Sequence, residues 1–138
     1  MRRRLVRAAA IVYAVTSPVG AVFQLAIAAG APWGAYTMGG RFPGAVPPAM
    51  RLTALAQALL IAAMVWVVLA RAGVILTGGS RRARRLVWGV VGFSAVSLLL
   101  NLVTPSAGER ALWAPVAAAL LVTSTVVASA APKTGHRG

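Results

Sequence analysis

Residues 52–70, "LTALAQALLIAAMVWVVLA", form a run of 19 residues without a charged side chain, and this run decides the fold. As an α-helix it would be about 28 Å long, close to the roughly 30 Å thickness of the hydrocarbon core of a membrane. A helix satisfies its own backbone hydrogen bonds, which is necessary where no water is present. The run is therefore predicted to be a membrane-spanning helix, with Arg51 and Arg71 at its two ends.

Three more uncharged runs of similar length lie elsewhere in the chain. They cover residues 8–31, 86–104 and 111–132 and contain 24, 19 and 22 residues. Little sequence remains outside these runs for a separate soluble domain, so we expect one domain over residues 1–138. The predicted fold class is all-α: a polytopic membrane protein built as a four-transmembrane-helix bundle.

Two local patterns place the starts of the second and fourth spans. Pro47 and Pro48 suit the first turn of a helix, where the N–H that proline lacks has no intrahelical partner. Ser106 and Glu109 match the capping box, in which the serine accepts the N–H of the glutamate and the glutamate reaches back to the N–H of the serine. With the uncharged runs, these patterns predict spans at about 8–31, 48–70, 86–104 and 107–131.

The charge balance is strongly basic, but it does not indicate a nucleic-acid partner. The 138 residues include fourteen Lys or Arg and one Asp or Glu, for a formal net charge of +13, and 59% of them are hydrophobic. A nucleic-acid surface needs basic side chains along one water-exposed face, whereas here they occur in clumps between apolar runs. The chain has no cysteine, and its only histidine, His136, lies in a polar tail. Neither a metal nor another cofactor is therefore expected.

The basic residues also predict the orientation in the membrane, because cytoplasmic loops carry an excess of Lys and Arg. Eleven of the fourteen bases fall on the side of the two termini and of the loop at 71–85, and three, Arg41, Arg51 and Arg110, fall on the other. Both termini are therefore expected in the cytoplasm (N-in/C-in). The composition, rich in Arg, Ala and Val, is typical of a GC-rich bacterial genome, so the expected location is a bacterial cytoplasmic (inner) membrane.

The cytoplasmic loop at 71–85 holds a dense basic cluster, made of Arg81, Arg82, Arg84 and Arg85. Bases near a membrane surface are attracted to anionic lipid headgroups by about 1 kcal/mol each. Membrane lipids are therefore the expected partners of this loop.

The loop between the first two spans, residues 32–47, is long for a compact domain and reads "PWGAYTMGGRFPGAVP". Its glycines and prolines favour tight turns, and Trp33 and Tyr36 are residue types that favour the membrane interface. We therefore expect an ordered outer loop that covers the outer end of the bundle. Its Arg41 is expected close to Glu109, the only acidic residue.

Polar residues inside the spans fall at similar depths. Ser94, Ser97 and Asn101 are three and four residues apart, which places them on one face of a helix, and Gln24 and Gln57 lie at comparable depth on the first two spans. If these faces point inwards, they form a polar pocket beneath the outer loop. The predicted ligand-binding residues are Gln24, Tyr36, Arg41, Arg51, Gln57, Asn101, Glu109 and Arg110.

Two plainer interpretations of these polar residues stay open. Ser, Asn and Gln within membrane helices join neighbouring helices by hydrogen bonds, with no ligand involved. In the second interpretation, Glu109 caps the positive end of the fourth helix and has no further role.

The pocket favours a binding or partner module, an integral membrane protein that offers an outward-facing polar site to a small molecule, a lipid headgroup or a membrane partner. One alternative is a permeation pathway, a transporter or channel, lined by the face of Ser94, Ser97 and Asn101. A less favoured alternative is a membrane-embedded enzyme acting on lipophilic substrates, because Glu109 is the only acid available for acid–base chemistry. No catalytic residue is assigned, and a homo-oligomer stays open as a further partner.

Two stretches resemble a known family. The stretches "APWGAYTMGGRFPG" (residues 31–44) and "NLVTPSAGERALWAP" (101–115) are similar to those of an uncharacterised family of small four-span bacterial integral membrane proteins. The resemblance covers most of the chain. It implies four spans and a shared outer surface, and it implies no reaction, because no activity is established for that family.

Overall fold

The computed structural model describes residues 2–75 and 81–130, and this part of the chain is all-helical. Its long helices are α1 (Arg2–Ala29), α2 (Pro48–Arg71), α3 (Arg81–Val103) and α4 (Ala107–Ala128). Two short 3-10 turns, η1 (Gly34–Tyr36) and η2 (Met38–Gly40), lie between α1 and α2. All four long helices are long and apolar enough to cross a membrane, which indicates a multi-pass membrane protein.

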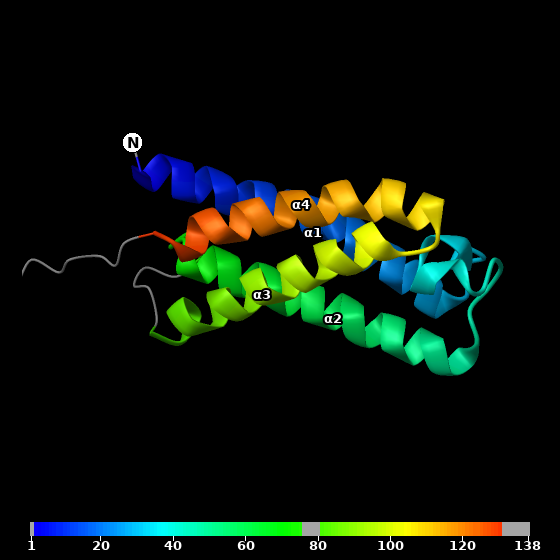
Figure 1. The fold of residues 1–138 in the computed structure, drawn as a ribbon. Helices are drawn as coiled ribbons and strands as arrows, with labels where there is room; N and C mark the ends of the chain where they lie inside the picture. Colours follow the sequence, from blue (N-terminus) through cyan, green and yellow to red (C-terminus); the bar gives the residue numbers. More distant parts are fainter. Residues whose placement is uncertain (1, 76–80, 131–138) are drawn as a thin grey trace, which may run out of the picture.

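Consecutive helices run antiparallel and form a bundle in which each helix has two main neighbours (Figure 1). Helix α1 packs against α2 and α4, and α3 packs against α4 and α2. The contact between α2 and α3 is the least extensive of these four. We call the end that carries the α1–α2 loop the loop end, and the end at which α1 and α3 begin the basic end.

Two helices begin earlier than the sequence predicts. Helix α1 starts at Arg2 rather than near residue 8, and α3 starts at Arg81 rather than near residue 86. Arginine is a good helix former, so a helix can continue past the apolar run into polar surroundings. The arginines of the predicted basic loop therefore lie on the first turns of α3. The middle of that loop, residues 76–80, and the C-terminal bases Lys133 and Arg137 lie outside the described residues.

The bundle core consists of two clusters of buried side chains. The larger cluster lies nearer the basic end and draws on all four helices through residues that include Tyr13, Val68, Val87 and Val127. The smaller cluster lies at the loop end and consists of Phe23, Ile27, Val46 and Ala54. Because Val46 belongs to the α1–α2 loop, this second cluster packs the loop against the helices.

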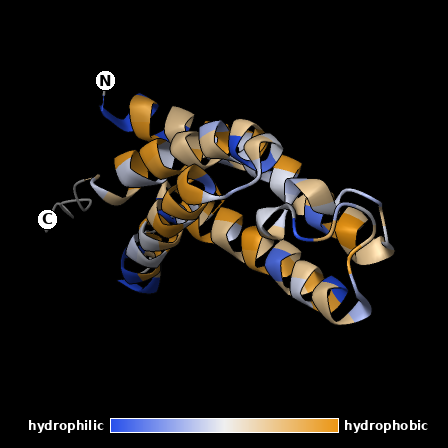
Figure 2. Cartoon of the chain, turned by 45° about the vertical axis from the view of Figure 1, so that its right-hand side comes forward, coloured by the Kyte–Doolittle hydropathy of each residue, from blue (hydrophilic) through white to orange (hydrophobic). Residues whose placement is uncertain are grey.

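Large apolar side chains also cover the outside of the bundle. Leu52 and Val103 are 71% and 75% exposed, and many other leucines and valines of the described helices are exposed with them. Figure 2 shows that hydrophobic residues predominate along the four long helices. An apolar surface of this extent is suited to lipid rather than to water.

Arginines at the basic end bind the carbonyl groups of other helices. Arg7 Nη2 donates a hydrogen bond to Gly73 O at 3.3 Å, just beyond the end of α2. Arg71 Nη2 donates to Ala130 O, just beyond the end of α4. The last carbonyls of a helix lack intrahelical partners, and cations stabilise that negative end. Two of the bases at this end therefore join helices to one another.

Candidate functional site

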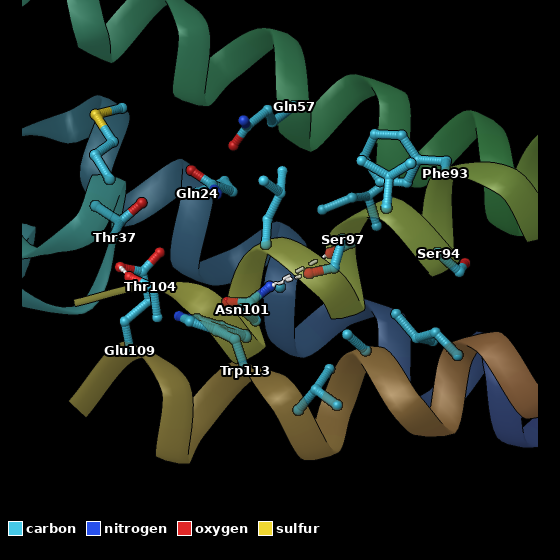
Figure 3. Close-up of a pocket in the computed structure, with 18 of the residues that line it drawn as sticks. Gln24, Thr37, Gln57, Phe93, Ser94, Ser97, Asn101, Thr104, Glu109 and Trp113 are labelled. Atoms are coloured by element: carbon cyan, nitrogen blue, oxygen red, sulfur yellow. Dashed lines mark hydrogen bonds between the residues drawn. The ribbon is translucent and has the colours of Figure 1, made fainter. Parts of the chain in front are cut away.

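A partly open cavity of about 600 Å³ lies between the helices towards the loop end, and exposed residues such as Leu100 and Val103 form part of its wall. Side chains from all four helices and from the α1–α2 loop line it (Figure 3). Its polar lining residues are Tyr13, Ser17, Gln24, Thr37, Gln57, Ser94, Ser97, Asn101, Thr104 and Glu109. Apolar residues such as Ile61, Met64, Phe93 and Leu120 line the part nearer the basic end.

The packing of the helices explains where this cavity lies. Among the four neighbouring pairs, helices α2 and α3 have the least extensive contact, and both contribute lining residues. The loop residues Thr37, Met38 and Gly39 line the cavity at the loop end. At the basic end the larger core cluster fills the space between the helices. The cavity is therefore a pocket that is closed towards the basic end.

The side chain of Glu109 fastens the loop to this end of the bundle. Its Oε2 accepts one hydrogen bond from Gly39 N–H at 2.8 Å and another from Thr104 Oγ1 at 2.9 Å. Gly39 and Gly40 have φ angles of 72° and 71°, a conformation that residues with a side chain rarely adopt. The two glycines allow the turn that aims the Gly39 N–H at the carboxylate.

The start of α4 forms half of the predicted capping box. Ser106 Oγ accepts the N–H of Glu109 at 3.1 Å, which confirms Ser106 as the N-cap. The second predicted bond, from the Ser106 N–H to the Glu109 carboxylate, is not formed, so this part of the prediction was wrong. Ser106 N–H instead donates to Thr104 Oγ1 at 3.4 Å, because the carboxylate is engaged by the loop. Ser106 Oγ also donates to Ala35 O at 2.8 Å, which adds a second attachment of the loop.

Trp113 provides a third attachment. Its Nε1 donates to Tyr36 O at 2.8 Å, and its ring packs edge-on against Phe23, with the ring centroids 4.7 Å apart. Phe23 in turn stacks on Trp33 at a centroid distance of 6.1 Å. The loop is thus held by hydrogen bonds to the start of α4 and by the aromatic contact of Trp33 with Phe23 of α1, which itself packs on Trp113 of α4.

Two amide oxygens at the cavity accept no hydrogen bond from the described residues. Gln24 Oε1 is buried, and no group in the described part of the chain donates to it. Asn101 Nδ2 donates to Ser97 O at 2.8 Å, so the nitrogen of this amide is used and its Oδ1 is left as an acceptor. Figure 3 shows Gln24, Gln57 and Asn101 approaching the cavity from three different helices.

The structure brings four of the eight predicted binding residues to the cavity, namely Gln24, Gln57, Asn101 and Glu109. The other four, Tyr36, Arg41, Arg51 and Arg110, do not line it.

The three arginines of this group take other positions. Arg51 Nε donates to Val46 O at 3.1 Å, and Arg110 Nη1 donates to Thr104 O at 2.8 Å. Arg41 is exposed. Among the described residues, Glu109 forms no ion pair with any of the three. Arg51 and Arg110 bind carbonyl groups instead, and the Glu109 carboxylate accepts from the Gly39 N–H and the Thr104 hydroxyl.

Gly39 is the functional residue that the sequence did not indicate. It acts through its backbone N–H, and no side-chain pattern marks a backbone donor. Thr104 and Trp113 were also missed, although both are close in sequence to the capping box at Ser106.

The chemistry of the cavity is that of a binding site. Among the described residues, Glu109 is its one charged lining side chain, and no lysine, arginine, histidine or cysteine lines it. Within residues 2–75 and 81–130, no three His, Cys, Asp or Glu side chains cluster in a way that could hold a metal ion. The lining therefore offers hydrogen bonds and apolar contact, with a single carboxylate.

Comparison of the chain with protein-family models, with curated proteins and with solved structures finds no match.

Proposed function

We propose that the chain is a membrane-embedded binding protein whose cavity holds a small amphiphilic molecule. The observation that carries the proposal is the buried Gln24 Oε1, which lacks a hydrogen-bond partner although its residue lines a cavity. Leaving a buried acceptor unpaired costs about 1–3 kcal/mol. A ligand that donates a hydrogen bond there would remove this cost.

The size and the lining of the cavity support a ligand with one polar end. Ligand pockets commonly measure about 300–1,000 Å³, a range that includes this cavity. The amides and Glu109 lie towards the loop end, whereas Ile61, Met64 and Leu120 lie deeper. The polar group of the ligand would therefore lie beneath the loop and its apolar part between the helices.

A permeation pathway is less well supported. A pore must continue to the basic end, where the larger core cluster fills the bundle with buried side chains such as Val68 and Val127. An enzyme is less well supported as well. Among the described residues, Glu109 and Tyr13 are the only lining side chains that could act as an acid or a base.

The first test uses the fluorescence of Trp113, which lines the cavity. A variant with Trp33, Trp66 and Trp88 replaced by phenylalanine keeps Trp113 as its sole tryptophan. In phosphatidylcholine nanodiscs, ω-bromodecanol is expected to quench this fluorescence with a saturable component. Ala117→Phe, at a buried lining position, should abolish saturation because the ring occupies the cavity.

The matched control is Ala111→Phe, which places the same ring at an exposed position of α4 that does not line the cavity. It should leave the saturable quenching unchanged. Quenching that saturates equally in Ala117→Phe and Ala111→Phe would contradict the proposal, because the probe would then bind elsewhere.

For the orientation we propose a cytoplasmic membrane, with the basic end inside the cell and the loop end outside. The chain has no cysteine, so single-cysteine variants can be labelled selectively. Gly44 and Ile75 are exposed positions near the loop end and the basic end, respectively. A membrane-impermeant maleimide is expected to label Gly44→Cys in intact cells and Ile75→Cys only after lysis. The reverse pattern would overturn the orientation.

A further inference from the structure

We infer that the ligand carries a cationic, hydrogen-bond-donating head, such as a protonated amine, and that this head binds at Glu109, Asn101 and Gln24. The inference rests on the proposed function and names the class of ligand for the same cavity.

The first argument is the local charge. The chain as a whole carries a formal charge of +13, yet among the described residues Glu109 is the only charged side chain that lines the cavity. Two arginines near the loop end, Arg110 and Arg51, donate to carbonyl groups of the chain instead. The cavity is therefore negative inside a strongly positive protein.

The second argument is that the carboxylate has no cation of its own. Glu109 Oε2 accepts two hydrogen bonds, from Gly39 N–H and Thr104 Oγ1. Within the described residues, Glu109 Oε1 receives no hydrogen bond, and no ion pair is formed. A partly buried carboxylate is stabilised by an opposite charge, because water solvates it incompletely. A cationic ligand supplies that charge.

The third argument is that several acceptors gather near the carboxylate at the polar end. The orientation of the Asn101 amide is fixed, because only its nitrogen can donate to Ser97 O, and its oxygen remains. Gln24 Oε1 is a second free acceptor, and Glu109 Oε1 is a third. A protonated primary amine has three N–H donors, as the lysine ammonium does. An anionic head would instead lie close to a carboxylate, with no Lys or Arg among the described lining residues to balance it.

The ring of Trp113 adds a fourth feature. Its N–H is turned to Tyr36 O, so the part of this side chain that is left for the cavity is the aromatic ring. Tryptophan is the aromatic side chain that attracts a cation most strongly. Figure 3 shows Trp113 on α4, the helix that also carries Glu109.

The test compares three probes with the same chain and different heads: ω-bromodecylamine, ω-bromodecanol and ω-bromodecanoate. Binding is measured by saturable quenching of Trp113 in phosphatidylcholine nanodiscs, at a pH where the amine is protonated and the acid is ionised. In the chain with Trp113 as its sole tryptophan, the cavity should bind the amine at least about tenfold more tightly than the carboxylate. A factor of ten in affinity corresponds to about 1.4 kcal/mol, the size of one good charged contact. This preference opposes the net charge of the chain, which attracts anions.

Glu109→Gln keeps an acceptor for Gly39 and Thr104 but removes the charge, so it should reduce the preference for the amine to about twofold or less. Arg41→Gln is the control, because it removes an exposed charge that does not line the cavity. Its preference for the amine should match that of the unsubstituted chain.

The possible failures are distinguishable. If ω-bromodecanoate binds as tightly as the amine and Ala117→Phe abolishes both signals, the binding function stands and the cationic ligand class is overturned. A preference for the amine that survives Glu109→Gln also overturns it. If none of the three probes gives saturable quenching, the proposed function fails, and the inference fails with it.

Discussion

Replacing Gly34 with alanine is expected to destabilise the folded chain by about 3 kcal/mol, the upper part of the usual range for overpacking. A Cβ added at Gly34 would lie 1.9 Å from Phe42 O and 2.6 Å from Gly44 O, distances that require the backbone to move. Gly34 N–H also donates to Gly44 O at 3.0 Å, so the two segments of the loop are held together at this point. The free energy of unfolding can be measured by titrating SDS into mild detergent micelles and following circular dichroism.

Gly44→Ala is the matched control, because its added Cβ would have no atom within 4 Å. It changes the same residue type in the same loop, and its unfolding free energy should stay within about 0.5 kcal/mol of wild type. Equal stability of the two alanine variants would show that the loop segments are not packed as closely as described.

Glu109→Ala is expected to release the loop and to raise the rate of trypsin cleavage after Arg41 by at least about tenfold. The substitution removes the hydrogen bonds to Gly39 and Thr104. A hydrogen bond to a charged group contributes about 1.5–3 kcal/mol, and 1.4 kcal/mol corresponds to a factor of ten. Cleavage of a folded chain follows the population of the open form, so the rate reports this change. Mass spectrometry of the fragments identifies the cut at Arg41.

Glu109→Gln serves as the control for this experiment, because a neutral amide oxygen can still accept both bonds. Its cleavage rate after Arg41 should stay within a few-fold of wild type. If Glu109→Ala were cleaved no faster than Glu109→Gln, the remaining contacts at Ser106 and Trp113 would be sufficient to hold the loop.

The four long apolar helices could be predicted from sequence because lipid imposes a simple requirement. A run such as 52–70 must satisfy its own backbone groups, and only its length and lack of charge are needed to recognise it. The ends of the helices depend on a different property. Helices α1 and α3 begin at Arg2 and Arg81, before the apolar runs begin. A hydropathy pattern indicates which residues suit the hydrocarbon layer, and it does not indicate where the hydrogen-bonded helix ends.

The convergence of Gln24, Gln57 and Asn101 on one cavity could also be anticipated. Depth follows from counting residues from the helix end, and the face follows from spacings of three and four. The partners of the arginines could not be predicted in the same way. A long side chain at a helix end can reach many carbonyls, and Arg51 binds Val46 O five residues earlier rather than Glu109.

The contact between Glu109 and Gly39 illustrates the remaining limit. Its partners are 70 residues apart, and one of them contributes only a backbone N–H. The path of the loop decides this bond, and the path depends on all the packing around Val46 and Trp113. The local pattern at Ser106 was sufficient for the cap, because both of its groups lie within four residues.

The same long separation has a consequence for biosynthesis. A ribosome adds about 5–20 residues per second, so Gly39 leaves it on the order of ten seconds before Glu109. Arg71 must likewise wait for Ala130, which is 59 residues later in the chain. The first helical hairpin therefore enters the membrane with its loop still unfastened at one end and a guanidinium without its carbonyl at the other. Helix α4, which is synthesised after α1, α2 and α3, completes the loop end with Glu109 and then the basic end with the carbonyl of Ala130.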